Sequence, residues 1–182
     1  FVILISRITF SQEEENALFD ILKKQLNWQE VIGICIQNKI LGLFWYNMTE
    51  RNYHHVIPKQ IRLVCEYFYK CNKLHNLEMM EEFQKICLEF EAGGIKYAPL
   101  KGIQFLNEYY TDLGSRQLGD IDVLVNSSDY KIIKKIMNDL GYIEGEYEYV
   151  EKRIIPIDRK LQLLHQKSIG NFHPFKKIAD DK

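Results

Sequence analysis

Residues 100–125 read LKGIQFLNEYYTDLGSRQLGDIDVLV, a polar, glycine-punctuated segment that ends in an apolar run carrying two aspartates, Asp120 and Asp122. An isolated carboxylate in an apolar setting is costly unless it is paired, hydrogen-bonded or bound to a metal. Two carboxylates side by side also repel each other. The sequence therefore predicts that a partner or ligand offsets this cost.

The alternation of the run predicts where these carboxylates point. Residues 121–125 are predicted to form a strand, in which residues two apart project from the same face. Asp120 and Asp122 would point together, with Ile121 and Val123 on the opposite, packed side. Convergent carboxylates suit Mg²⁺, which prefers carboxylate oxygens supplemented by water and phosphate. The plainer alternative is an Asp pair that solvates a sheet edge or caps a turn.

The upstream residues predict a place for phosphate. Lys101 and Gly102 open a predicted helix, whose free N–H groups attract anions and whose glycine lets the backbone approach a phosphate. Ser115 and Arg116 precede the aspartates, where they would add a hydroxyl and a fork-shaped cation.

Composition places the chain among ordinary soluble globular proteins. Hydrophobic residues make up 46% and charged residues 27% of the 182 residues, and the formal net charge is -1. The near-neutral charge disfavours duplex nucleic acid as a partner but leaves a nucleotide open as a small ligand. The four cysteines lie in predicted apolar helices without a C-x-x-C pair, which favours reduced core cysteines over a disulfide framework or zinc site. The opening FVILISRITF is too short to span a membrane, and we expect a cytoplasmic protein.

The two halves of the chain differ in texture. A capping box at Ser11–Glu14 begins a series of helices, and a long helix from Pro58 carries an apolar stripe that stops at Gly93–Gly94. The stripe runs through Ile61, Val64, Phe68, Cys71, His75, Met79, Phe83, Ile86 and Phe90. Strands and short helices follow. We therefore predict an α+β protein with a helical lobe over residues 1–93 and a small mixed-sheet α/β lobe over residues 94–182. The second lobe could continue in a longer parent chain.

The second half is predicted in finer detail. Strands are expected at residues 95–100, 121–125 and 160–166, with one or two more within residues 142–157. Helices are expected at residues 103–110 and from the Asn126–Asp129 start to Gly141.

The order of strand, L-K-G, helix, arginine and D-I-D-V-L-V resembles the uncharacterised nucleotidyltransferase family of the polymerase-beta-like superfamily. The resemblance implies that Asp120 and Asp122 are catalytic, metal-binding carboxylates. It also implies that Lys101, Gly102 and Arg116 face the nucleotide phosphates. The specific match covers residues 97–125.

The resemblance also calls for a third acid on a later strand. The predicted strand KLQLLHQ, residues 160–166, has Leu163 at the expected position. Asp158, or one of Glu144, Glu146 and Glu148, could replace that acid. His165 could serve as a base or hold the strand through a hydrogen bond.

Two hypotheses follow. The first is a nucleotidyltransferase that uses Mg²⁺, in a two-metal site, to transfer a nucleoside monophosphate from a nucleoside triphosphate to the hydroxyl of an unknown small-molecule or protein acceptor. The second is a catalytically inactive binding or regulatory module with the same fold, motivated by Leu163.

Overall fold

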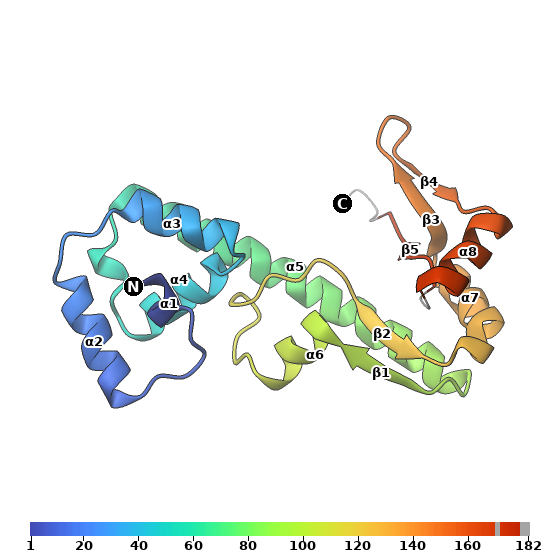
Figure 1. Cartoon of the computed structure of the whole chain (residues 1–182), viewed down its shortest axis with the longest axis horizontal. Coiled ribbons are helices and arrows are strands. Elements are labelled where there is room, and N and C mark those ends of the chain that lie inside the picture. Colours follow the sequence, from blue (N-terminus) through green and yellow to red (C-terminus); the bar gives the residue numbers. More distant parts are fainter. Residues whose placement is uncertain (170–171, 179–182) are drawn as a thin grey trace. The chain divides into compact units, whose positions relative to one another are not determined.

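Helices make up most of the first half of the chain, and short strands enter after residue 94. The computed structural model describes residues 1–169 and 172–178. The helices are α1 (Val2–Ile5), α2 (Gln12–Leu22), α3 (Trp28–Gln37), α4 (Leu41–Glu50), α5 (Lys59–Ala92), α6 (Lys101–Glu108), α7 (Tyr130–Asp139) and α8 (Arg159–Ile169), with 3-10 turns η1 (His54–Val56) and η2 (Ser127–Asp129). The strands are β1 (Tyr97–Leu100), β2 (Asp122–Val125), β3 (Ile143–Glu148), β4 (Arg153–Pro156) and β5 (Phe175–Lys176), as Figure 1 shows. The predicted α+β class is confirmed.

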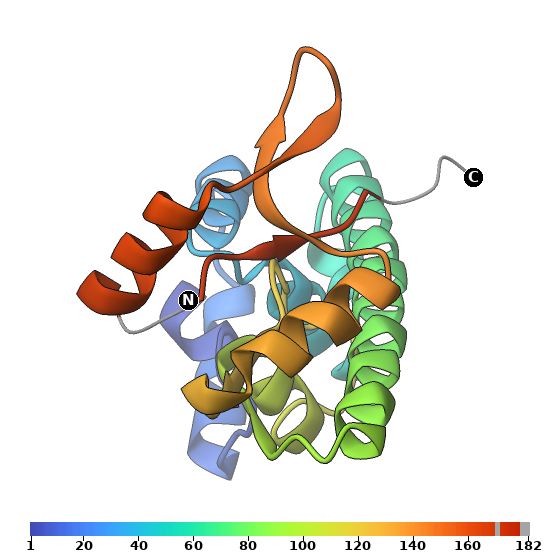
Figure 2. The same cartoon turned by 90° about the vertical axis from the view of Figure 1, so that its right-hand side faces the viewer.

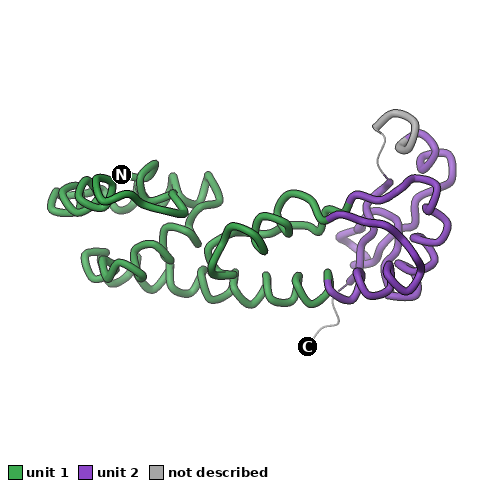
Figure 3. The backbone as a smooth tube through the Cα atoms, turned by 90° about the horizontal axis from the view of Figure 1, so that it is seen from below, with its two compact units in different colours: residues 1–83, 99–123 green, residues 84–98, 124–182 purple. Residues whose placement is uncertain are grey.

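The chain divides into two compact units, which Figure 3 colours separately. Unit 1 contains Phe1–Phe83 and Pro99–Val123, and unit 2 contains Gln84–Ala98 and Leu124–Lys182. The predicted boundary at residues 93 and 94 marks the end of α5, whereas the compact units interleave along the chain. Residues 100–122, with all the predicted phosphate-binding and metal-binding side chains, fall in unit 1.

The N-terminal helices form where the local chemistry predicts them. Ser11 Oγ accepts a hydrogen bond from the Glu14 amide at 3.3 Å, and Glu14 Oε2 accepts one from the Ser11 amide at 2.9 Å. This capping box satisfies two amides that the first turn of α2 would leave without partners. A single apolar cluster lies among the first helices, with buried members Ile5, Leu18, Val31, Ile32, Cys35, Leu41, Phe44, Trp45, Met48, Ile57 and Cys65.

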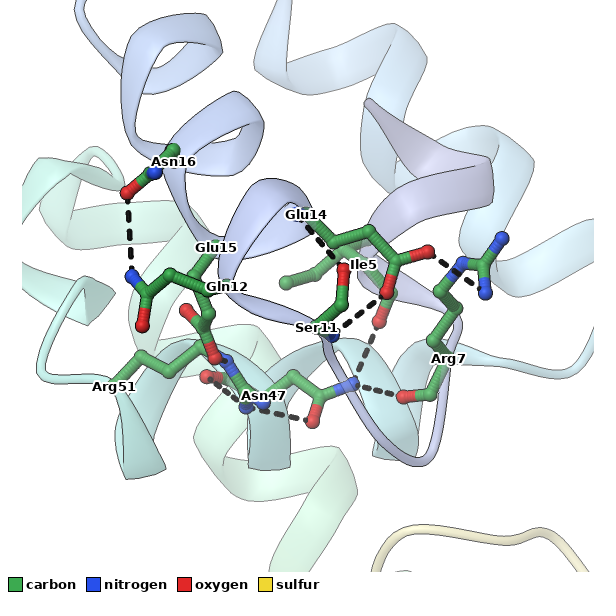
Figure 4. Close-up of polar contacts among 9 residues, drawn as sticks. All are labelled: Ile5, Arg7, Ser11, Gln12, Glu14, Glu15, Asn16, Asn47 and Arg51. Carbon is green, nitrogen blue, oxygen red and sulfur yellow. Dashed lines mark hydrogen bonds and ion pairs between the residues drawn. The ribbon is translucent and has the colours of Figure 1, made fainter.

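A buried asparagine ties the N-terminal segment to α4, as Figure 4 shows. Asn47 is only 1% exposed, and its Nδ2 donates to the carbonyl of Ile5 at 2.7 Å and to that of Arg7 at 2.9 Å. Its Oδ1 accepts from Nη1 of Arg51 at 3.1 Å, and Arg51 Nε pairs with Glu15 Oε1 at 2.8 Å. One side chain thus satisfies the last carbonyl of α1 and one carbonyl of the turn after it, and it contacts the arginine that pairs with α2.

Helix α5 ends where the sequence predicts. The amide of Ile95 donates to the carbonyl of Phe90 at 2.8 Å, and that of Gly94 to the carbonyl of Glu91 at 3.0 Å. Gly94 has a φ of +68°, a left-handed conformation that glycine adopts without strain and that commonly ends a helix.

The buried face of α5 differs from the predicted apolar stripe. Val64 is 56% exposed, and Cys71 and His75 are exposed as well. Asn72 and Asn76 are buried instead, at 7% and 0% exposure. The middle of the stripe was therefore predicted wrongly, because α5 turns two asparagines inward at that point.

Strand β1, helix α6 and strand β2 follow α5 in sequence and form a small module. β1 pairs with β2, and Figure 1 shows the two strands running in opposite directions. α6 buries Ile103 and Leu106, which pack with Leu118 from the segment before β2. This packing places the start of α6 close to the segment that carries the aspartates.

Unit 2 contains a three-stranded sheet with β3 in the centre. β3 pairs antiparallel with β4, from Gly145 opposite Pro156 to Glu148 opposite Arg153, and antiparallel with β5. Figure 2 shows the hairpin of β3 and β4 in orange. Strands within residues 142–157 are as predicted. The single mixed sheet is replaced by a two-stranded sheet and a separate three-stranded antiparallel sheet.

The predicted strand at residues 160–166 is wrong, because this segment lies within helix α8. Asp158 Oδ1 accepts a hydrogen bond from the Leu161 amide at 2.9 Å, which is the bond made by a helix N-cap. Leucine, glutamine and lysine favour helices, and the segment has no β-branched residue before residue 169. Leu163 therefore lies in a helix and not at the third-acid position of a strand.

The cysteines are free, but only two of them are fully buried. Cys35 and Cys65 lie in the N-terminal core, where burial raises the pKa of Cys35 to about 11 and that of Cys65 to about 12. Cys71 is exposed and Cys87 is half-buried. Core placement was therefore predicted correctly for Cys35 and Cys65 and wrongly for Cys71.

Replacing Asn47 by alanine is expected to destabilise the protein by about 2 kcal/mol, because two backbone carbonyls lose their donors in a buried setting. Urea denaturation measures the change. The matched control is Asn16→Ala, since Asn16 is exposed and accepts only a 3.3 Å bond from Gln12 among the contacts in Figure 4. The control should change stability by less than about 0.5 kcal/mol. Equal effects of the two substitutions would contradict the role given to Asn47.

Candidate nucleotide site

Both aspartates are in contact with solvent, whereas their apolar neighbours in the sequence suggest that they are buried. β2 begins at Asp122, so Asp120 and Ile121 lie in the preceding loop. Asp120 is exposed, and the Asp122 side chain keeps 29% of its surface exposed. Strand alternation therefore applies to Asp122 onward and does not fix where Asp120 points. Neither carboxylate is buried, so both are accessible to a ligand in solution.

An ion pair joins the start of α6 to the start of β2. Lys101 Nζ lies 3.1 Å from Asp122 Oδ2, with the lysine side chain 72% exposed. Two residues predicted for the same site, 21 positions apart in sequence, are thus brought together within unit 1. A pair this exposed adds little to stability, because water and salt screen it.

The backbone at Lys101 is strained. Its φ is +50°, a region that glycine adopts readily and that costs other residues roughly 1–2 kcal/mol. The next residue, Gly102, has a packing reason of its own, since a Cβ there would lie 2.9 Å from Cδ2 of Leu118. The N-cap residue of α6, Leu100, makes no side-chain hydrogen bond to the first turn. The N-cap therefore supplies no acceptor for the first amides of α6, which lie at the helix end that attracts anions.

Asp112 organises the turn that leads to Arg116. Its carboxylate accepts from the Gly114 amide at 2.7 Å and from the hydroxyl of Tyr69, and it pairs with Lys73 Nζ at 2.6 Å. Burial of this carboxyl acts to raise its pKa, but the hydrogen bonds from Lys73, Tyr69 and the Gly114 amide outweigh burial and hold the pKa of Asp112 below its usual value.

Ser115 serves this turn directly. It is 3% exposed, and its Oγ donates to the carbonyl of Asp112 at 2.6 Å. The hydroxyl predicted to bind phosphate therefore already has an internal acceptor, and its burial favours a role in holding the loop.

Arg116 is held at both its backbone and its side chain. Its carbonyl accepts from Nδ2 of Asn72 at 2.9 Å and from Nδ2 of Asn76 at 2.5 Å. Its guanidinium carbon lies 5.5 Å from the ring centroid of Phe105 and 5.6 Å from that of Tyr110, within the range of a cation–π contact. Nη1 donates to the Tyr110 hydroxyl at 3.4 Å, and the buried Nε has no hydrogen-bond partner among the described residues.

The asparagines that hold Arg116 were not found from the sequence. Asn72 and Asn76 are four residues apart, so they share one face of α5. Their spacing is the signal that could have identified them, because two amides on one face can serve the carbonyls of an irregular loop.

The remaining acid candidates lie in unit 2 and have structural partners there. Asp158 caps α8, and this helix also contains His165, whose side chain lies outside the described part of the structure. Glu146 pairs with His173 Nε2 at 3.0 Å and with Lys176. Glu148 accepts from the amides of Val150 and Glu151 at 3.0 and 2.5 Å.

Glu144 is the most buried of these acids, at 3% exposure. Its Oε2 accepts from the Tyr130 hydroxyl at 2.6 Å, from Lys134 Nζ at 2.9 Å and from the amide of Gln162. Burial, with the hydrogen bond to Glu144, raises the pKa of Tyr130, so its hydroxyl remains a donor at neutral pH. Within residues 1–169 and 172–178, no group of three or more His, Cys, Asp or Glu side chains forms a ready-made metal site.

Comparison with known proteins identifies the family. The model of a family described as uncharacterised nucleotidyltransferases matches residues 24–179. The chain belongs to this family. The resemblance carried by residues 97–125 is confirmed, and the match extends through most of both compact units. Neither the curated proteins nor the solved structures contain a match to the chain.

Membership of the uncharacterised nucleotidyltransferase family sets the general chemistry. Nucleotidyltransferases act on nucleotides and transfer nucleoside monophosphates, so the family points to a nucleotide substrate and a transferase reaction. Among the described helices, none has the length and apolar character needed to cross a membrane.

The strain at Lys101 predicts that glycine is more stabilising than alanine at this position, the reverse of their usual order inside a helix. Lys101→Gly is expected to be more stable than Lys101→Ala by about 1 kcal/mol, because both remove the charge and only glycine relieves the left-handed backbone. At the exposed position Asn107, inside the same helix, alanine should be the more stable by about 1 kcal/mol. Urea denaturation of the four variants measures both differences. The same order at the two positions would contradict the strain.

The stability supplied by Asp112 is expected to depend on pH. Its folded pKa lies below its unfolded pKa of about 3.9, so its contribution is complete above the unfolded pKa and is lost as pH falls through the folded pKa. Asp112→Asn should cost roughly 1–2 kcal/mol at pH 7, and the gap to wild type should shrink below about pH 4. Urea denaturation across this range tests it, with the exposed Asp139→Asn as control. A gap that stays constant to pH 2.5 would contradict the assignment.

Proposed function

We propose that the protein is a Mg²⁺-dependent nucleotidyltransferase that transfers a nucleoside monophosphate from a nucleoside triphosphate to a hydroxyl acceptor. The observation that carries the proposal is the meeting of Lys101 and Asp122 at the uncapped start of α6, beside the exposed Asp120. A cation, a helix N-terminus and two accessible carboxylates are the groups that a metal–triphosphate complex needs. Family membership supplies the reaction class.

The two carboxylates have the chemistry that magnesium requires of its ligands. Both are oxygen donors open to solvent, and water and phosphate oxygens would complete the coordination. Asp120 and Asp122 would hold the metal, in a two-metal site if the protein is active. A bound Mg²⁺ neutralises phosphate charge and aligns the attacking and leaving oxygens.

The positive groups of unit 1 would bind the phosphates of the triphosphate. Lys101 leaves Asp122 to contact the phosphates, and the amides at the start of α6 donate to phosphate oxygens. Arg116, whose guanidinium contacts the rings of Phe105 and Tyr110, would offer its charge to the same anion. Catalysis then comes chiefly from alignment and charge neutralisation.

The reaction balances without a further cofactor. The acceptor oxygen forms a bond to the α-phosphorus, and the bond from that phosphorus to the bridging oxygen breaks. Pyrophosphate leaves with the electron pair of the broken bond, and the proton of the acceptor hydroxyl passes to water. The acceptor hydroxyl belongs to a small molecule or a protein.

A second candidate function is a non-catalytic nucleotide-binding or regulatory module. It is favoured by the partners already made by the later acids, since Asp158 caps α8 and Glu144 is enclosed by Tyr130, Lys134 and Gln162. Transfer of label from a triphosphate to any acceptor would exclude this candidate.

Replacing both aspartates by asparagine is expected to weaken Mg²⁺–triphosphate binding tenfold or more and any turnover roughly a hundredfold or more, because the metal loses its charged ligands. Titration calorimetry with Mg²⁺ and each nucleoside triphosphate measures binding. The control is Asp20→Asn with Asp139→Asn, which removes the same charge from exposed positions elsewhere. Wild-type protein that binds no triphosphate, or a double variant that binds as wild type does, would overturn the proposal.

A further inference from the structure

Two aromatic side chains are exposed at α6, Phe105 inside the helix and Tyr109 at its C-cap. Phe105 is 45% exposed and Tyr109 is 57% exposed, while Ile103 and Leu106 face the core. The two rings contact each other edge to face, with centroids 5.8 Å apart. Packing within unit 1 accounts for the apolar face of α6, but it leaves both of these rings open to solvent.

The ring of Phe105 also contacts Arg116. The guanidinium carbon of Arg116 lies 5.5 Å from its centroid, and the carbonyl of Arg116 is held by Asn72 and Asn76. The Phe105 side chain stays 45% exposed beside this cation, so part of the ring is available for stacking. The exposed pair is therefore an ordered surface, anchored to the loop that carries a predicted phosphate ligand.

The position of this surface relative to Lys101 suggests its ligand. Lys101 is the first residue of α6, Phe105 lies about one turn further on, and Tyr109 is the C-cap residue about one turn after that. At 1.5 Å per residue, Phe105 lies roughly 6 Å and Tyr109 roughly 12 Å along the axis from Lys101. Positive charge at one end and aromatic rings at the other complement a molecule with an anionic and a flat apolar end.

We propose that Phe105 and Tyr109 form the stacking surface for the base of the nucleoside triphosphate, with the phosphates at Lys101 and the start of α6. This inference rests on the proposed function and adds the base-binding subsite to it. Every base has a stacking face, so stacking discriminates weakly among bases. The site accordingly accepts all four common nucleoside triphosphates with similar affinity.

The test compares a nucleotide with an anion that has no base. Wild-type protein is titrated with ATP, GTP, CTP, UTP and inorganic tripolyphosphate, each with Mg²⁺. Wild type is expected to bind the four nucleotides within about fivefold of one another, and about tenfold or more tighter than tripolyphosphate.

The variant that isolates stacking is Tyr109→Leu, because the cation–π contacts of Arg116 are with Phe105 and Tyr110 and stay in place. It should lose about fivefold or more in nucleotide affinity and keep its affinity for tripolyphosphate. Phe105→Leu with Tyr109→Leu should bring the two ligands to equal affinity. Tyr67→Leu, at a tyrosine 72% exposed on α5, is the matched control.

The outcomes separate the two proposals. If wild type binds neither ligand, both the proposed function and the base subsite are overturned. If wild type binds tripolyphosphate as tightly as nucleotides, or if Tyr109→Leu binds nucleotides as wild type does, the base subsite is overturned and the phosphate site stands. A preference for one nucleotide much above fivefold contradicts stacking as the means of recognition.

Discussion

Two buried asparagine amides fix the path of the chain between α6 and β2. Asn72 donates to the carbonyls of Gly114 and Arg116, and Asn76 to those of Leu113 and Arg116. An irregular loop has carbonyls without ladder partners, and burying them against a helix is costly unless that helix supplies donors. Because α5 supplies these donors, the loop can pack against α5. This packing places Arg116 and the start of β2 in unit 1.

This constraint explains which parts of the fold the sequence can predict. The capping box of Ser11 and Glu14 and the stop at Gly93–Gly94 depend on residues a few positions apart, so their chemistry is visible in the sequence. Asparagines inside a helix usually face solvent, and their burial at Asn72 and Asn76 depends on carbonyls some forty residues away. The predicted stripe on α5 failed in its middle for this reason.

In the candidate site, too, local features could be predicted from the sequence and features that depend on distant residues could not. Lys101 and Asp122 were predicted to serve one site, as phosphate and metal ligands, and the structure joins them in an ion pair that the sequence did not predict. The apolar neighbours of Asp120 suggested burial, yet the strand begins too late to enclose that residue. Residues 160–166 alternate leucines as a strand would, but Asp158 provides a helix cap and the helix formers that follow continue from it. Local capping chemistry was stronger there than a short period-two pattern.

The order of Lys101 and Gly102 supports the proposed nucleotide site at the start of α6 on physical grounds. The backbone at residue 101 would be less strained with glycine, while at residue 102 a side chain would press against Leu118. Stability alone would therefore favour glycine at both positions. The ion pair between Lys101 and Asp122 adds little stability to offset this strain, because water screens it. Strain maintained for a solvent-exposed cation is characteristic of sites where that charge meets a ligand, and here the exposed cation stands at the uncapped start of a helix.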